Sequence, residues 1–369
     1  MRSLEACMKK TKIESLQALR ALAFLGVFLT HCEVIPNLGG WGVSVFIVLS
    51  GFLMVYSYND RLENLDISVV GNARFAASKM KRLYPLHLIM MFSALLITVA
   101  QMYMGISSLT IVQLLIQIVL QSTLLQALIP FSPIYYMPLN GLTWYLSVSM
   151  ILYFFFPWIL RRIKKVTTPR LLWESFVLYL IIFVVTAVDQ LLVTDNEGLQ
   201  TYFNYVCPFL RLCDFSMGCN FGMIFLRNRG RIKTGSANCL EAITVLLTVA
   251  SIWFFNIDHK SLLGQTIAHS AFLYAPTSIA LVYLFAEKKG FFSKLLTNKL
   301  FTYIGDISPY GYLIHQKVIA YLIILFTHIL GNPLNDYVRT ILTVIITIGA
   351  IYAYKELERK QFFRKKIGA

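Results

Sequence analysis

The stretch ALRALAFLGVFLTHCEV, residues 18–34, is apolar enough for a membrane helix, yet it contains Arg20 and His31. Eleven residues are close to three helical turns, so both side chains would lie on one helix face, about 16 Å apart along the axis. Ionisable residues inside a membrane segment are costly and usually functional. An arginine that snorkels to the interface and a histidine at the helix end are the ordinary alternatives. We therefore predict a functional helix face that carries Arg20 and His31.

The composition of the whole chain is that of a membrane protein. Of 369 residues, 57% are hydrophobic and 14% are charged, and the mean hydropathy is +0.66. Several runs approach the roughly 20 apolar residues that span a hydrocarbon core. The alternating polarity of membrane strands is absent. We predict an all-α polytopic membrane protein with a single membrane-embedded domain, residues 1–369.

The net charge of +15 would suit nucleic acid, but its distribution does not. Six short segments between or outside the apolar runs hold 28 of the 33 Lys and Arg residues. These segments are 1–14, 59–82, 161–170, 227–233, 286–299 and 355–369. Basic residues that flank spans mark the cytoplasmic side, and they also attract anionic lipid. The charge therefore reflects topology, and we expect no nucleic-acid partner.

The positions of the basic segments predict about ten transmembrane helices with both termini in the cytoplasm. The spans are predicted at 15–34, 41–58, 83–104, 142–160, 171–188, 202–226, 238–255, 265–286, 301–329 and 336–354. Residues 105–140 are apolar too, but a crossing there would deliver the basic segment 161–170 to the outside. The polar residues in this stretch include Gln113, Gln117, Gln121, Ser122 and Gln126. We predict that 105–140 is an external or re-entrant element.

Other polar features have both structural and functional interpretations. Ser50 and Gly51 form a small pair within an apolar run, which suggests direct packing on the His31 face or generic helix packing. Lys79, Lys81 and Arg82 precede the third span, where basic residues set topology and can equally bind a phosphorylated ligand. The six cysteines form no CxxC pair. We therefore predict buried thiols, no metal site and no bound cofactor.

Six segments, in order from Leu16 to about Tyr354, resemble the acyltransferase 3 family of integral membrane acyltransferases. Arg20 and His31 reproduce its arginine, ten-residue gap and histidine. The other segments are GVSVFIVLSGFLM with Ser50 and Gly51, KMKRLYPLH with Lys79, Lys81, Arg82 and Tyr84, LTWYLSVSM with Trp144, RLCDFSMGCNFG with Arg211 and Asp214, and IGDISPYGYLIHQ with His315.

The chain also departs from the pattern of that family. Lys79 replaces the first arginine of the basic loop, and Asp214 stands where glutamate is common. Ser149 occupies a place that is glutamate in many members, so no carboxylate role is assigned there. The chain ends after the tenth predicted span, so we expect the stand-alone form without a fused SGNH-type domain.

The resemblance implies transfer of an acyl group, usually acetyl, from cytoplasmic acyl-CoA to a hydroxyl of a cell-surface glycan or its lipid-linked precursor. It implies a multi-pass protein of the bacterial cytoplasmic membrane. The expected donor-binding residues are Lys79, Lys81, Arg82 and Tyr84, and the supporting residues are Ser50, Gly51, Trp144, Arg211, Asp214 and His315. For the pair Arg211 and Asp214, an internal ion pair is an equal alternative.

Two roles are open for each residue of the first helix. His31 either removes the proton of the acceptor hydroxyl or is itself acylated. Arg20 either stabilises the thioester oxyanion or binds a phosphate. A polytopic transporter or flippase without covalent chemistry is the alternative function, because ten spans with buried charges suit it as well. A membrane-bound partner without catalysis is a third possibility.

Overall fold

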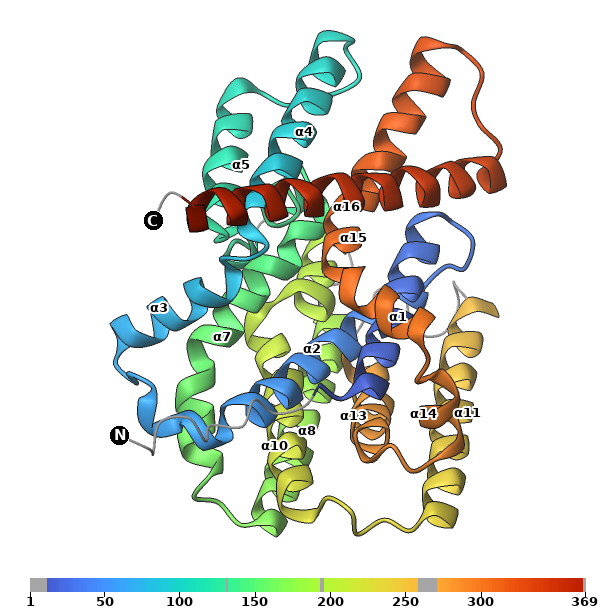
Figure 1. Ribbon diagram of the computed structural model, residues 1–369. Coiled ribbons are helices and arrows are strands. Elements are labelled where there is room, and N and C mark those ends of the chain that lie inside the picture. Colours follow the sequence, from blue (N-terminus) through green and yellow to red (C-terminus); the bar gives the residue numbers. More distant parts are fainter. Residues whose placement is uncertain (1–11, 131, 193–195, 258–270, 368–369) are drawn as a thin grey trace.

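The computed structural model describes residues 12–130, 132–192, 196–257 and 271–367 (Figure 1). Over these residues the chain is helical and contains no β-strand, which confirms the predicted all-α class. The α-helices are α1 (Glu14–His31), α2 (Leu38–Tyr58), α3 (Val69–Met80), α4 (Tyr84–Tyr103), α5 (Ile111–Thr123), α6 (Pro133–Tyr136), α7 (Trp144–Ile163), α8 (Thr168–Leu192), α9 (Glu197–Thr201), α10 (Pro208–Asn228), α11 (Thr234–Ile257), α13 (Ala271–Glu287), α14 (Phe291–Leu296), α15 (Lys299–Ile323) and α16 (Asp336–Ile367). Short 3₁₀ helices are η1 (Asn59–Asn64), η2 (Gln126–Leu128) and η3 (Gly141–Thr143), and π-helices are η4 (Tyr202–Val206) and η5 (Ile324–Ile329).

Among the described residues, 8 helical segments are long and apolar enough to cross a membrane. They are Leu38–Asn64, Tyr84–Tyr103, Gly141–Ile163, Thr168–Leu192, Glu197–Asn228, Thr234–Phe254, Lys299–Ile329 and Asp336–Lys360. Helix α1 is not among them, because its 18 residues include Glu14, Arg20 and His31. The chain is therefore a polytopic membrane protein.

Every predicted span overlaps a helix of the structure. Residues 265–270 of the eighth predicted span lie outside the described residues, and α13 covers the rest. Helix α16 continues to Ile367, well past the predicted end of the last span at residue 354. The count of ten crossings and the cytoplasmic termini stay predictions.

Helix α2 forms the centre of the bundle and packs against α1, α10 and α13. Within its apolar window 72% of the residues are buried, against 22% in α8 and 17% in α16. Figure 1 shows α16 lying across the direction of α7, and it packs against α15. Apolar helices that bury so little of their surface suit contact with lipid.

Glycines allow α2 and α10 to approach at backbone distance. A Cβ atom at Gly51 would overlap the carbonyl oxygen of Phe215, and one at Gly218 would overlap that of Val48. Of the two alternatives for Gly51, the structure shows generic helix packing, because Gly51 faces α10 and not the His31 face of α1. Helix α1 instead meets α2 at Gly42, where a Cβ would overlap the Ala23 carbonyl oxygen.

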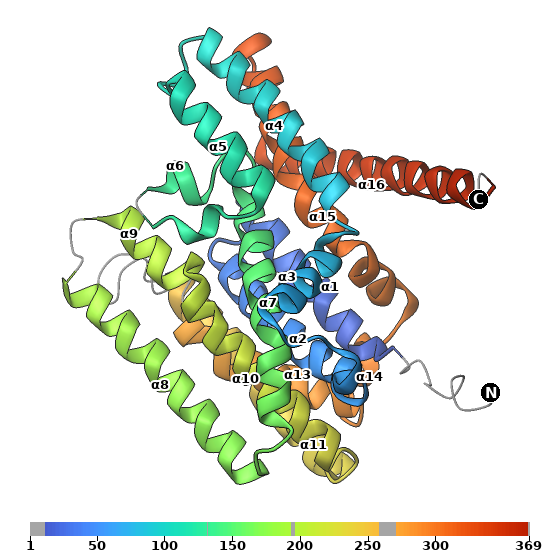
Figure 2. The same cartoon turned by 90° about the vertical axis from the view of Figure 1, so that its left-hand side faces the viewer.

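Residues 105–130 and 132–140 contain the short helices α5, η2 and α6, joined by turns. Helix α5 has 13 residues, about 20 Å of rise, which is less than a hydrocarbon core of about 30 Å. Its glutamines face the protein: the Gln121 amide donates to Thr143 Oγ1 at 2.7 Å, and Gln117 is buried. Figure 2 shows α5 beside α4, and Tyr84 donates to the Ser122 carbonyl at 2.7 Å. The non-crossing element stays a prediction, supported by this length.

Candidate active site

Helices α1 and α15 lie against each other and bring two predicted site residues together. The backbones approach closely, because a Cβ at Gly305 would overlap the Gln17 carbonyl oxygen. Farther along, His31 Nδ1 lies 3.1 Å from His315 Nε2, across 284 residues of sequence. His315 is fully buried, whereas His31 is partly exposed. A reactant could therefore reach the His31 ring but not the His315 ring.

Aromatic side chains surround the histidine pair. The ring centroids of Phe24 and Phe28 lie 6.0 and 5.5 Å from that of His315. On its other nitrogen, His315 Nδ1 lies 2.9 Å from the Gly311 carbonyl oxygen, one turn earlier. Among the described residues, neither histidine has a carboxylate within ion-pair distance. Within the described part of the chain the pair therefore has no acidic partner.

Arg20 lines a cavity of about 150 Å³ at the other end of the α1–α15 contact. Its polar lining residues are Arg20, Ser50, Tyr145, Tyr153, Ser308 and Tyr312. The Tyr145 hydroxyl interacts with those of Ser50 and Ser149, and Tyr153 also interacts with Ser50. Ser50 therefore faces Arg20, while its neighbour Gly51 faces α10.

Sequence reasoning missed the tyrosines and Ser308 of this cavity. The α7 tyrosines had a detectable signal: Tyr145, Ser149 and Tyr153 follow one another at intervals of four residues, which places them on one helix face. Tyr312 connects the cavity to the histidines. Its ring centroid lies 5.5 Å from that of Tyr145 and 6.3 Å from that of His315.

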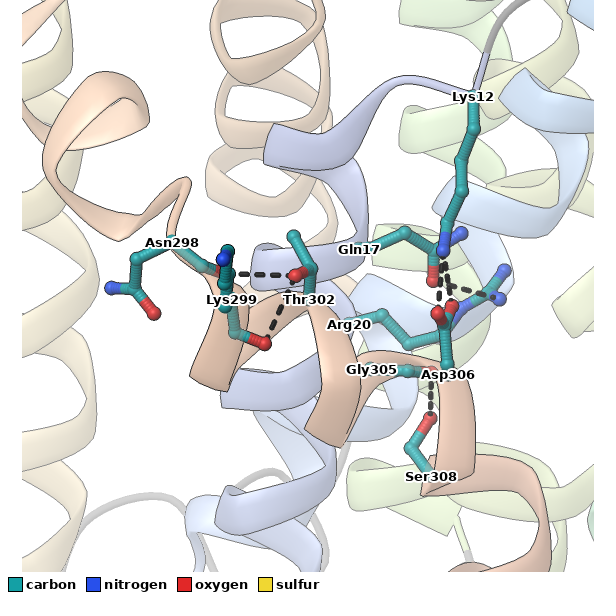
Figure 3. A network of polar contacts seen from close by, with 9 residues as sticks. All are labelled: Lys12, Gln17, Arg20, Asn298, Lys299, Thr302, Gly305, Asp306 and Ser308. Carbon is teal, nitrogen blue, oxygen red and sulfur yellow. Dashed lines mark hydrogen bonds and ion pairs between the residues drawn. The ribbon is translucent and has the colours of Figure 1, made fainter.

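Arg20 keeps its positive charge available inside the protein. Its guanidinium donates to Gln17 Oε1 at 3.4 Å (Figure 3). Asp306 attracts it, but Lys12 Nζ already contacts both carboxylate oxygens of Asp306, at 2.5 and 2.6 Å. Within the described part of the chain, Arg20 forms no direct ion pair. An anion in the cavity would therefore meet a guanidinium that has no direct carboxylate partner among the described residues.

The predicted donor-binding residues divide into two groups. Lys79 contacts the Tyr58 hydroxyl and lies 4.2 Å from that ring centroid. Arg82 Nε donates to the Tyr310 hydroxyl at 3.0 Å. Lys81 and Tyr84, by contrast, line an open groove of about 840 Å³. Of the four, Lys81 and Tyr84 line this groove, and Lys79 and Arg82 do not.

The groove combines a basic wall with an apolar one. Its lining includes Arg74, Lys81 and Tyr84, together with Met80, Leu124 and Met150. Arg74 was not predicted, although its seven-residue spacing from Lys81 corresponds to two helical turns. Leu83 lines the Arg20 cavity while the adjacent Tyr84 lines the groove. The groove and the Arg20 cavity thus lie on either side of the start of α4 and share no lining residue.

Arg211, Asp214 and Trp144 form a separate cluster. Arg211 Nη1 lies 3.3 Å from Asp214 Oδ2, and both side chains are buried. Arg211 Nε also donates to the Tyr205 carbonyl at 2.8 Å, and the Trp144 ring centroid lies 4.7 Å from that of Tyr205. This geometry agrees with the internal ion pair that the sequence analysis gives as the alternative to a supporting role in the site.

A family model described as an acyltransferase domain matches residues 13–354, nearly the whole chain. No curated protein and no solved structure gives a match. The matched region contains both ends of the α1–α15 contact, with Arg20, His31 and His315. The chain therefore belongs to the acyltransferase 3 family and is a multi-pass membrane acyltransferase.

Proposed function

We propose that the protein moves an acyl group, in the first instance acetyl, from cytoplasmic acyl-CoA to a hydroxyl of a cell-surface glycan or its lipid-linked precursor. The observation that carries this proposal is the histidine pair, with one accessible ring and one sealed ring. A neutral imidazole is the side chain best suited to remove a hydroxyl proton near neutral pH. The bacterial cytoplasmic membrane is the proposed location.

In the proposed reaction His31 first accepts a proton and later donates it. The ring takes the proton of the acceptor hydroxyl while the hydroxyl oxygen attacks the thioester carbonyl carbon. The carbon–sulfur bond then breaks, and the CoA thiolate takes the proton back from His31. The products are the glycan ester and free CoA, and His31 returns to its neutral form. Acylation of His31 itself is the competing route.

Arg20 is too far from His31 to contact the same reacting atom. Their positions on α1 are about 16 Å apart along the axis. Helical side chains lean toward the N-terminus, as Arg20 does when it donates to Gln17. This geometry supports the anion-binding alternative over the oxyanion alternative. We propose that Arg20 holds a phosphate or carbonyl of the donor while the thioester lies near His31.

The groove is the proposed outer part of the donor site. Arg74 and Lys81 supply positive charge for phosphates, and Met80, Leu124 and Met150 supply an apolar surface for the rest of the donor. Adjacent residues of the chain, Leu83 and Tyr84, line the Arg20 cavity and the groove, so a donor bound in the groove would lie near the helix start that borders the cavity. Lys79 and Arg82, which have aromatic partners, would then shape the groove rather than bind the donor.

The test is covalent transfer by purified protein in proteoliposomes. Acetyl-CoA with a radiolabelled acetyl group is added together with a lipid-linked saccharide fraction. We expect alkali-labile label in the saccharide, with release of CoA thiol. Movement of saccharide across the vesicle membrane without label or thiol release would establish the transporter or flippase instead.

A further inference from the structure

We propose that His315 is a positioning residue that fixes the tautomer of His31 and leaves His31 Nε2 as the free basic nitrogen. The inference rests on the proposed function, because it assigns a role within that reaction. It starts from the two contacts that His315 makes in the structure. Nδ1 faces the Gly311 carbonyl oxygen at 2.9 Å, and Nε2 faces His31 Nδ1 at 3.1 Å.

The chain of hydrogen bonds has only one consistent direction for two neutral rings. A carbonyl oxygen can only accept, so His315 Nδ1 carries the hydrogen and donates it to Gly311. His315 Nε2 then holds a lone pair and must accept from His31 Nδ1. The carbonyl of Val27, one turn earlier on α1, is a second acceptor for the His31 ring, and a neutral ring with a single hydrogen can satisfy it only by sharing the Nδ1–H with His315. The one ring nitrogen left with a free lone pair is His31 Nε2.

Burial divides the two rings between two tasks. His315 is fully buried beneath Phe24 and Phe28 and has no route to a reactant. His31 is partly exposed. Since no carboxylate pairs with either ring in the described part of the chain, the neutral His315 ring takes the orienting place that an acid holds in other catalytic pairs.

The contribution to the reaction follows from the charge that forms on His31. When Nε2 takes the hydroxyl proton, His31 becomes an imidazolium and its Nδ1–H becomes a stronger donor. The hydrogen bond to His315 Nε2 is then charge-assisted, so it is stronger in the transition state than in the resting enzyme. His315 keeps its own hydrogen throughout. Its loss should therefore lower kcat and leave KM for the donor unchanged.

Two substitutions separate this role from simple packing. In His315→Gln the amide reaches about as far as Nε2 and can still accept from His31, so kcat should stay within about fivefold of wild type. His315→Asn is shorter and keeps only a donor for Gly311, so kcat should fall by about ten- to a hundredfold. The matched control is His328→Asn, because His328 is exposed in η5 away from the pair. It should keep wild-type kinetics.

The tautomer itself is measured by ¹⁵N NMR of histidine-labelled protein in detergent micelles. Subtraction of the His31→Gln spectrum assigns the His31 nitrogens. We expect a protonated Nδ1 and a bare Nε2, with this pattern lost or mixed in His315→Asn. A protonated His31 Nε2 in wild type, equal kcat in the two His315 variants, or an unchanged tautomer in His315→Asn would overturn the inference. The NMR result stands even if no acyl transfer is found, so failure of the proposed function is recognised separately.

Discussion

Two polar pairs from the same set of sequence motifs have opposite characters in the fold. Arg211 and Asp214 are three residues apart on α10, 3.3 Å from each other and sealed from solvent. His31 and His315 are 284 residues apart, on two helices, with one ring accessible. Charge and burial alone would rank the first pair higher as a site. Accessibility and an unused lone pair favour the second.

The difference lies in what remains available after the protein has folded. The Arg211 guanidinium donates to Asp214 and to the carbonyls of Tyr205 and Asn204. The two carbonyl contacts hold the π-helix η4 against α10. In the hydrogen-bond pattern inferred for the histidine pair, His31 Nε2 has no partner among the described residues. Removing one member of a buried ion pair destabilises the fold because the other charge is left without its partner, whereas an accessible base can react.

The largest expected effect is on stability, from Arg211→Ala. Removal of one member of a buried pair leaves an uncompensated charge, so the free energy of unfolding should fall by about 3–5 kcal/mol. Denaturant titration in detergent micelles measures it. The double variant Arg211→Met/Asp214→Leu should be less destabilised than Arg211→Ala, because it leaves no buried charge. If a stably folded Arg211 variant lost acyl transfer, the Arg211–Asp214 pair would take part in the reaction. The contrast between a structural ion pair and a reactive histidine pair would then be wrong.

An intermediate effect is expected for Arg20→Ala, which removes from the cavity a guanidinium that has no direct carboxylate partner among the described residues. KM for acyl-CoA should rise by about ten- to a hundredfold, since a hydrogen bond to a charged group is worth about 1.5–3 kcal/mol. Initial-rate kinetics per mole of inserted protein measure it, with Arg20→Lys as the control that keeps the charge. A fall in kcat at unchanged KM would contradict this and indicate that Arg20 stabilises the oxyanion of the reacting thioester.

The smallest effects are expected in the groove. Lys81→Ala and Arg74→Ala should each raise KM for acyl-CoA by about three- to tenfold, with less effect at high salt, because the groove is open to solvent. Lys79→Ala is the matched control: its charge lies on Tyr58 and Phe75, so it should lower stability and leave KM unchanged. A raised KM in Lys79→Ala with an unchanged KM in Lys81→Ala and Arg74→Ala would place donor binding at Lys79 and outside the groove.

The sequence predicted the helices and the shared face of Arg20 and His31 because both follow from periodicity along one segment. It could not predict which residues of 79–84 face a ligand. A turn at residues 81–83 separates α3 from α4 and redirects each side chain. The Arg20 cavity was equally hidden, because Tyr145, Ser308 and Tyr312 meet Arg20 only through contacts between distant helices. The spacing of residues along one segment predicts which of them share a helix face. A site built from several helices can be recognised only when the packing of those helices is known.

The most direct measurement compares wild-type protein with His31→Gln in the proteoliposome transfer assay, per mole of inserted protein. The substitution removes the proton acceptor without burying a charge, so insertion and thermal stability should match wild type. Transfer of label from acetyl-CoA to saccharide should fall by about 10²–10⁴-fold, while His328→Gln, an exposed histidine, keeps full activity. Substantial transfer by the His31→Gln protein would contradict the account and move the chemistry away from the α1–α15 contact.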